Sequence, residues 1–334
     1  MKKVISVLSL ILAVIVAFSA CGNVAEETTA AEETTAAEKA VINIGLLKGP
    51  TGMGAAVLLE NDELGTGNAD YNLTLAGAPD VLQSALINGE LDMAALPTNV
   101  ASVLNKKTEG NVQILAVNTL GVIYIMSTDE AIKTVADLKG KTILSAGKGT
   151  TTEYVLNYIL AENGLTVDSD ITVEYASEHA EVITKAVTGD YDVVLLPEPF
   201  VTQMKAQDAG FKVVLDLTKE WKAVGGGELT MGCIAVRKAF IKENPEAVKA
   251  FLADYENSVK AVNADPEKAG VIIERFDIAK AAVAAKAIPN CNITLMTGKE
   301  MQENVSAYLK VLFDSEPKSV GGALPGDDFW AVVA

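Results

Sequence analysis

The sequence has few of the residues on which metal and catalytic sites depend. It contains one histidine, His179, and three cysteines in 334 residues. No CxxC pair occurs, so a zinc site would have almost no thiolate or imidazole ligands. We therefore expect no metal site and no cofactor, and we expect His179 to be a surface or packing residue.

Aromatic residues and long apolar runs are also scarce. Aromatic residues make up 5% of the chain, and we interpret its two tryptophans, Trp221 and Trp330, as packing residues. A sugar site built on stacked aromatic rings is therefore disfavoured. After Val41 no apolar run approaches the ~20 residues that a membrane-spanning helix requires.

Positive charge is in the minority. The chain has 27 Lys and Arg against 44 Asp and Glu, a formal net charge of −17. Such a surface disfavours nucleic acid and anionic lipid head groups. It says little about a small ligand, because the ligand meets only the local field of its cleft. We expect no nucleic-acid partner.

The N-terminus reads as an export signal over residues 1–20. Lys2 and Lys3 precede an apolar run from Val4 to Phe18. The run is short and ends at small residues, which is typical of a secretory signal peptide. Ser19-Ala20-Cys21 resembles a bacterial lipobox, with Phe18 where Leu is more usual. The resemblance implies cleavage before Cys21 and lipid on its sulfur, which would anchor the protein to the outer face of the cell membrane. An ordinary secreted protein is the alternative.

Residues 21–40 read as a tether. The hexamer AEETTA occurs twice in tandem, at 25–30 and 31–36. Its Glu, Thr and Ala residues cannot bury enough apolar surface to fold, so we predict a disordered acidic spacer. A short helix is the alternative. Either form separates a folded body from a membrane.

The body that follows is long enough for a large core and, usually, for two domains. Two cysteines remain in it, Cys233 and Cys291. Because an exported protein can form disulfides, a bridge between them and two separately buried thiols both stay open.

Strands and helices alternate through the first part of the body. Val41–Leu47 and residues 72–77 read as strands, and Pro79 begins a helix that Gly89 ends. Such alternation predicts an α/β fold with a parallel sheet. After residue 229 the chain becomes mostly helical. We expect these helices, which have no partner strands of their own, to pack back on the first part.

One unit occurs twice, one hundred residues apart. "INGELDMAALPTN" (87–99) and "VTGDYDVVLLPEP" (187–199) align Gly89 with Gly189 and Pro97 with Pro197. A proline ends a central strand because it cannot continue the ladder. We interpret the repeat as a duplication of the fold, with a coincidence of common turn residues as the alternative. Lobe 1 is expected to comprise 41–127 and 230–334, and lobe 2 to comprise 128–229.

Four stretches carry a resemblance to a known family. "NGELDMAALPTN", "GDYDVVLLPEPF", "VADLKGKTI" and "VRKAFIKENPEAVKAFLADYENSV" are similar to the nitrate/sulfonate/taurine group of ABC-transporter substrate-binding proteins. That group also includes receptors for thiamine-pyrimidine precursors. The resemblance implies a type II periplasmic-binding-protein-like fold with a ligand cleft between two closing lobes. It also implies a small-molecule solute as ligand, an ABC permease as partner and a monomer. The tether and the acidic surface fit the surface of a Gram-positive cell better than a periplasm.

The cleft is expected at four turns. In open α/β sheets ligands bind beyond the carboxyl ends of the strands. Such ends precede residues 48–54, 97–99, 146–152 and 197–200, and a fifth stretch, GGGE at 225–228, could border the cleft. The candidate ligand-binding residues are Lys48, Pro50, Thr51, Gly52, Met53, Thr98, Asn99, Ser145, Lys148, Thr150, Thr151, Thr152, Glu198 and Glu228.

The charge of the ligand stays open at this point. Two of these Gly-rich turns lead into helix N-termini and offer the hydroxyls of Thr51, Thr150, Thr151 and Thr152, which suits an anion; a plain helix cap at Thr51 or Thr152 is the alternative. Glu198, between two prolines, could instead hydrogen-bond a cationic or amine-bearing ligand, or simply hold the turn. "GKGTTT" lacks the order of a P-loop, which excludes nucleotide binding on that ground.

A solute receptor is the leading hypothesis for the function. An enzyme on the same fold, of the thiamine-pyrimidine or menaquinone-pathway type, would need a general base in the cleft. Export argues against both pathways, since their substrates are cytoplasmic. A surface lipoprotein with a sensing or adhesion role is the third hypothesis.

Overall fold

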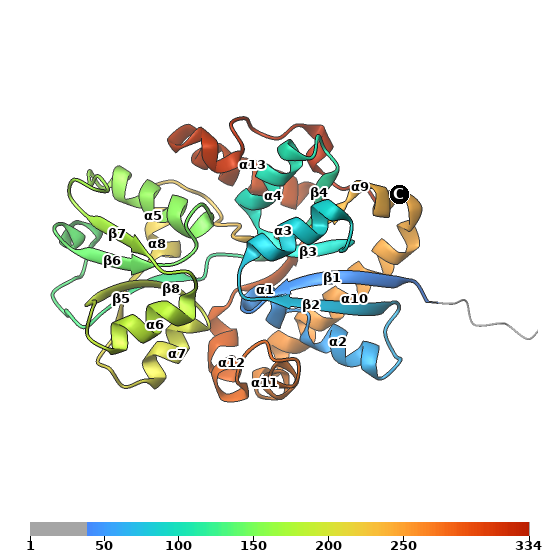
Figure 1. The fold of residues 1–334 in the computed structure, drawn as a ribbon, viewed down its shortest axis with the longest axis horizontal. Coiled ribbons are helices and arrows are strands. Elements are labelled where there is room, and N and C mark those ends of the chain that lie inside the picture. The colour runs from blue at the N-terminus through green and yellow to red at the C-terminus, as the bar shows by residue number, and fades with distance from the viewer. Residues whose placement is uncertain (1–38, 334) are drawn as a thin grey trace, which may run out of the picture. The chain divides into compact units, whose positions relative to one another are not determined.

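A computed structural model describes residues 39–333 (Figure 1). The expected signal peptide, Cys21 and almost all of the expected tether lie outside the described residues. Lys39–Ala334 form one compact unit. Within the described part, no helix is both long enough and apolar enough to cross a membrane.

The first sheet has six strands in the order β11-β4-β10-β3-β1-β2. Strands β1 to β4 run in one direction, and β10 lies antiparallel between β3 and β4. The edge strand β11 is also antiparallel to β4. The strands are β1 (Val41–Leu47), β2 (Asp70–Ala76), β3 (Met93–Pro97), β4 (Val112–Thr119), β10 (Gly232–Arg237) and β11 (Ile293–Met296).

The second sheet has five strands in the order β7-β6-β8-β5-β9. Here β5 is the antiparallel strand, paired with β8 on one side and β9 on the other. Apart from the edge strand β11, the two orders match strand for strand when one is reversed, with β10 and β5 in the same slot, which confirms the duplication. The strands are β5 (Ile123–Ser127), β6 (Thr142–Ser145), β7 (Thr172–Tyr175), β8 (Val193–Pro197) and β9 (Lys212–Asp216).

The chain passes between the sheets at residues 120–122 and returns before Gly232. The return lies close to the expected boundary at 230. The first passage comes earlier than the expected boundary at 127, because Ile123–Ser127 pair in the second sheet. A short apolar strand has the same sequence pattern in either sheet. Only the strands that pair with it show to which sheet it belongs.

Seven helices follow the parallel strands and cover the sheets. Gly89, with a φ of 80°, ends α3 as the sequence predicts. The helices beside the first sheet are α1 (Pro50–Met53), α2 (Ala56–Glu63), α3 (Pro79–Asn88) and α4 (Thr98–Lys107). Those beside the second sheet are α5 (Thr151–Glu162), α6 (His179–Val187) and α7 (Phe200–Ala206), and α8 (Leu217–Ala223) precedes the return.

The C-terminal helices pack back on the first lobe, as expected, and reach the second as well. Helices α10 and α11 contact α2, whereas α12 contacts α7 and α13 contacts α5. Between α12 and α13, Ile293–Met296 form strand β11, so the expectation that this region lacks a strand was wrong. Four residues are too few to show a strand period. The helices are α9 (Lys238–Glu243), α10 (Pro245–Ala264), α11 (Pro266–Arg275), α12 (Ala281–Ala287) and α13 (Gly298–Ser315), with short 3₁₀ turns η1 (Val135–Leu138), η2 (Ile288–Asn290), η3 (Pro317–Val320) and η4 (Asp327–Phe329).

The two body cysteines are free and fully buried, so no disulfide joins them. Cys233 packs in one apolar cluster, together with Leu96. Its neighbour on β10, Ile234, points to the opposite face of the sheet and packs in the cluster that contains Cys291. The two thiols therefore lie on opposite faces of the first sheet, which the sequence alone could not reveal.

Candidate functional site

Turns at the strand ends of both lobes enclose a cavity of about 140 Å³. The first lobe and the return segment contribute Leu47, Lys48, Gly49, Pro50, Thr51, Gly77, Pro79, Pro97, Thr119, Met231 and Gly232. The second lobe contributes Gly147, Thr150, Thr152, His179, Pro197, Glu198 and Phe200. The cavity thus lies where the general rule for α/β sheets places a ligand.

Glu198 is a buried carboxylate in the wall of this cavity. Pro197 ends β8, and the backbone N–H of Glu198 donates to the carbonyl of Val122 at 3.0 Å. The side chain is 2% exposed and accepts hydrogen bonds from the backbone N–H of Thr202 at 3.1 Å and from its hydroxyl at 3.2 Å. Desolvation raises the pKa of Glu198 above its ordinary value of 4.5.

His179 begins α6 and also lies in the cavity wall. Its ring centroid is 5.1 Å from that of Phe200, and its buried Nδ1 has no hydrogen-bond partner among the described residues. Burial lowers the pKa of His179 to about 4, so the imidazole is neutral at pH 7. His179 thus packs against Phe200, within the expectation of a surface or packing residue, and it also lines the cavity, because α6 begins in the turn that follows β7.

The base of the cavity is tightly packed around the start of β10. A Cβ added to Gly232 would lie 2.9 Å from Cγ2 of Thr51 and 2.9 Å from Oδ1 of Asn118. Only glycine leaves room at this position. Next to it, Thr119 is 2% exposed, and its hydroxyl has no hydrogen-bond partner within residues 39–333.

The lysines near the cavity are already engaged. The ammonium of Lys48 lies 2.8 Å from the carboxylate of Asp277, and this ion pair lowers the pKa of Asp277. Lys148 does not line the cavity; its ammonium lies 5.6 Å from the ring centroid of Tyr175. Lys48 is therefore paired with an opposite charge, and the charge of Lys148 lies outside the cavity wall.

The wall includes six of the residues singled out from the sequence, which are Lys48, Pro50, Thr51, Thr150, Thr152 and Glu198. Met53 and Ser145 are buried in the core, and the Ser145 hydroxyl donates to the carbonyl of Ala146. Gly52 and Thr98 are also buried outside the wall. Glu228 forms a surface ion pair with Lys222 at 2.7 Å.

Asn99 and Thr151 contact each other instead of the cavity. The Thr151 hydroxyl donates to the side-chain oxygen of Asn99 at 3.1 Å and accepts from the hydroxyl of Tyr308 at 3.0 Å. The Asn99 amide donates to the carbonyls of Gly149 and Ser319. This buried network joins α4 of the first lobe, α5 of the second lobe and the C-terminal α13.

Several other wall residues were not predicted from the sequence. Gly77 and Pro79 follow β2, Thr119 ends β4, and Met231 precedes β10. The same rule of strand ends, applied to the turns after β2, β4 and β7, would have found Gly77, Thr119 and His179. The rule could not have predicted Met231. Because β10 runs antiparallel to its neighbours, the start of this strand, and not its carboxyl end, lies at the cavity.

A wider hollow of about 720 Å³ adjoins the cavity. It shares Gly77, Pro79, Gly147 and Thr150 with the cavity wall. Lys148 lies in this outer part, as does Glu178. The hollow and the cavity therefore share part of their walls.

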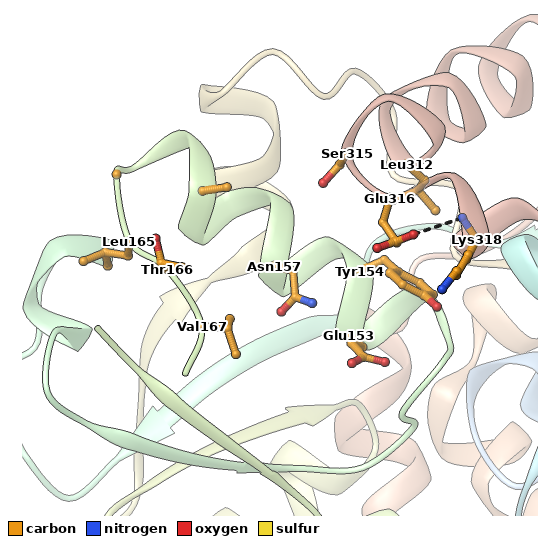
Figure 2. A pocket seen from close by; sticks show the side chains of 12 residues that line it. Glu153, Tyr154, Asn157, Leu165, Thr166, Val167, Leu312, Ser315, Glu316 and Lys318 are labelled. Atoms are coloured by element: carbon orange, nitrogen blue, oxygen red, sulfur yellow. Dashed lines mark hydrogen bonds between the residues drawn. The ribbon is translucent and has the colours of Figure 1, made fainter. Parts of the chain in front are cut away.

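A separate hollow of about 630 Å³ lies between α5 and the end of α13 (Figure 2). Figure 2 shows Tyr154 and Asn157 of α5 together with Glu316 and Lys318 from the segment after α13. The backbone N–H of Lys318 donates to Oε1 of Glu316 at 3.1 Å. This hollow shares no lining residue with the central cavity. It lies beside a helix surface, away from the strand ends, so we do not assign it to the site.

Comparison with protein families gives one match over most of the body. The model of a family described as "ABC transporter, phosphonate, periplasmic substrate-binding protein" matches residues 66–287. A curated relative from Brucella abortus, described as a binding protein, is 27% identical over 167 residues. That alignment spans about half of this chain and about half of the relative.

Solved structures share the fold. An ABC transporter protein of Parabacteroides distasonis superimposes with a TM-score of 0.71 at 24% identity, over 88% of this chain and 99% of that chain. The periplasmic aliphatic sulphonate-binding protein of Escherichia coli gives 0.69 at 18% identity, over 88% and 92%. The periplasmic nitrate-binding protein of Synechocystis gives 0.60 at 15% identity, over 85% and 84%. These likenesses confirm the expected two-lobe periplasmic-binding-protein fold.

Proposed function

The chain belongs to the phosphonate family of periplasmic substrate-binding proteins of ABC transporters, and from that premise we propose that it is a solute receptor. It binds one small molecule in the cavity between its lobes and delivers it to a membrane permease. The observation that carries this proposal is the cavity itself, because strand ends of both copies of the duplicated sheet contribute to its wall.

The two passages between the sheets suit a hinge. In each lobe the residue after the repeated proline is bonded to a passage, since Thr98 N–H donates to Met231 and Glu198 N–H donates to Val122, both at 3.0 Å. A ligand that touches both walls stabilises the closed arrangement by its differential affinity for it. Closure then presents a distinct surface to the permease.

Eight wall residues are proposed to contact the solute. Six come from the sequence analysis and two, Thr119 and His179, from the geometry of the cavity. The full set is Lys48, Pro50, Thr51, Thr119, Thr150, Thr152, His179 and Glu198.

The location of the receptor is part of the proposal. Lipid on Cys21 would hold the protein at the outer face of the cell membrane, as a monomer, on the surface of a Gram-positive cell. The support is the lipobox-like sequence and the acidic tether. Replacing Cys21 by Ser should move the protein from the membrane fraction to the medium; persistence of the variant in the membrane would refute the anchor.

A thermal-shift screen of residues 39–334 against small solutes tests receptor function. A solute at 100 times its dissociation constant stabilises the folded state by about 2.7 kcal/mol, which raises the unfolding midpoint by several degrees. The shift should vanish in a variant that fills the cavity. Recovery of each bound solute unchanged, by mass spectrometry, separates a receptor from an enzyme on the same fold. A folded protein that responds to no solute in a broad panel would count against the receptor.

A further inference from the structure

The charge of the cavity does not suit an anion. Among the wall residues the side chains that carry charge are Lys48 and Glu198, and Lys48 is paired with Asp277. Glu198 is 2% exposed and forms no ion pair with a described Lys or Arg. A phosphonate or sulfonate in this cavity would face Glu198, whose ionised form repels an anion strongly at low dielectric.

Glu198 has unused hydrogen-bonding capacity. An ionised carboxylate offers about four acceptor positions. The backbone N–H and the hydroxyl of Thr202 occupy two of them, one on each oxygen. The remaining acceptor positions are free. Because Glu198 lines the cavity, a hydrogen-bond donor bound there can occupy them.

Two further polar groups in the wall lack partners within the described chain. They are the Thr119 hydroxyl, on a side chain that is 2% exposed, and Nδ1 of the neutral His179 imidazole. A buried polar group without a partner is costly; the Thr119 hydroxyl can accept a hydrogen bond, and Nδ1 of His179 accepts one in the tautomer that carries its proton on Nε2. Around them, Pro50, Pro79 and Phe200 provide an apolar surface for a small body.

We propose that the cavity selects a small solute with a positively charged N–H donor group, and that Glu198 is the residue that determines this preference. A primary ammonium, an amidinium or a guanidinium group fits, because each forms charge-assisted hydrogen bonds with a carboxylate. This proposal rests on the proposed receptor function. It departs from the anions named for the family and for the sulphonate- and nitrate-binding neighbours.

Glu198 could instead serve only as a cap for α7, through its bonds to Thr202. In that case Glu198→Gln would change the stability of the protein and leave its choice of solute unchanged. The test must therefore read selectivity, and it must include an acidic residue that lies outside the cavity wall. Glu178, in the adjoining outer hollow, is the matched control.

The experiment is a thermal-shift and calorimetric comparison on residues 39–334 at fixed ionic strength. The cationic probes are methylammonium, acetamidinium and guanidinium, and the anionic probes are methylphosphonate, methanesulfonate and nitrate. Tetramethylammonium carries the charge without an N–H donor. We expect the N–H cations to bind and the anions and tetramethylammonium to bind far more weakly. Glu198→Gln should lose about 10- to 100-fold in affinity for the N–H cations, and Glu178→Gln should keep the wild-type affinity.

Each other outcome overturns the proposal. Binding of the anions without the cations would refute the preference and leave the receptor function standing. Equal binding of tetramethylammonium and methylammonium would refute the role of the N–H donor. If the folded wild type binds neither the cationic nor the anionic probes, the result would count against both the proposed preference and the receptor function. If Glu198→Gln does not fold, the preference of the wild type still decides between these outcomes.

Discussion

The hydroxyl of Thr151 donates a hydrogen bond to the side-chain oxygen of Asn99 at 3.1 Å, and so connects α5 of one lobe to α4 of the other. Both residues are buried, and Tyr308 completes the network by donating to Thr151 at 3.0 Å. The side chains of this network form their hydrogen bonds with one another and with backbone carbonyls of the protein. Asn99 and Thr151 were both candidates for ligand contact. In the structure they form a hydrogen bond with each other instead.

Thr151→Val should therefore destabilise the protein. It leaves the Asn99 oxygen without its Thr151 donor and the Tyr308 hydroxyl without its acceptor, at a cost of about 1–3 kcal/mol in the free energy of unfolding. Chemical denaturation measures the change. Thr184→Val, on the exposed side of α6, is the control and should stay within about 0.5 kcal/mol. A variant with normal stability but lost solute binding would place Thr151 in ligand contact instead.

Gly232→Ala should damage both the fold and the cavity. The added methyl group meets Thr51 and Asn118 at 2.9 Å, and such overpacking costs about 1–3 kcal/mol. Gly77→Ala is the matched control in the same wall, since its Cβ would make only an ordinary contact with Glu178 at 3.4 Å. The two variants should differ clearly in their unfolding midpoints and in their solute affinities. If they do not differ, the residues around Gly232 can move to make room for the added methyl group.

His179 should make the stability of the protein sensitive to acid. Its pKa is lowered to about 4 in the folded state, against 6.5 for the ordinary side chain. The neutral imidazole therefore contributes fully above pH 6.5, and the contribution falls as the pH drops from 6.5 towards 4, by at most about 3 kcal/mol. Free energies of unfolding across this range, for the wild type and for His179→Gln, measure it. The difference between the two should shrink with acid, and a constant difference would contradict the lowered pKa of His179.

Cys233 and Cys291 should behave as two unreactive thiols in the native protein. Both are fully buried, and burial raises the pKa of Cys233 to about 12, which leaves almost no thiolate at pH 7. Intact-mass measurements should show slow alkylation of the folded body under non-reducing conditions and two added groups after denaturation. No alkylation of the denatured, unreduced protein would reveal a disulfide.

The repeat around Pro97 and Pro197 made the architecture predictable. Strand ends, glycine turns and prolines are local signals, and they located both lobes and the turn that carries Glu198. The prediction failed where a partner far away in the chain decides. Ile123–Ser127 joined the second sheet, and Ile293–Met296 became an edge strand of the first.

The sequence by itself determined the duplicated α/β plan and the turns from which a ligand site is made, because strands, caps and turn prolines depend on near neighbours in the chain. Only the tertiary structure decided which side chains of those turns face the cavity. It paired Lys48 with Asp277, 229 residues away, and Asn99 with Thr151, while Glu198 and Thr119 kept free hydrogen-bonding capacity. Such pairings follow from the packing of distant segments, which no local pattern records.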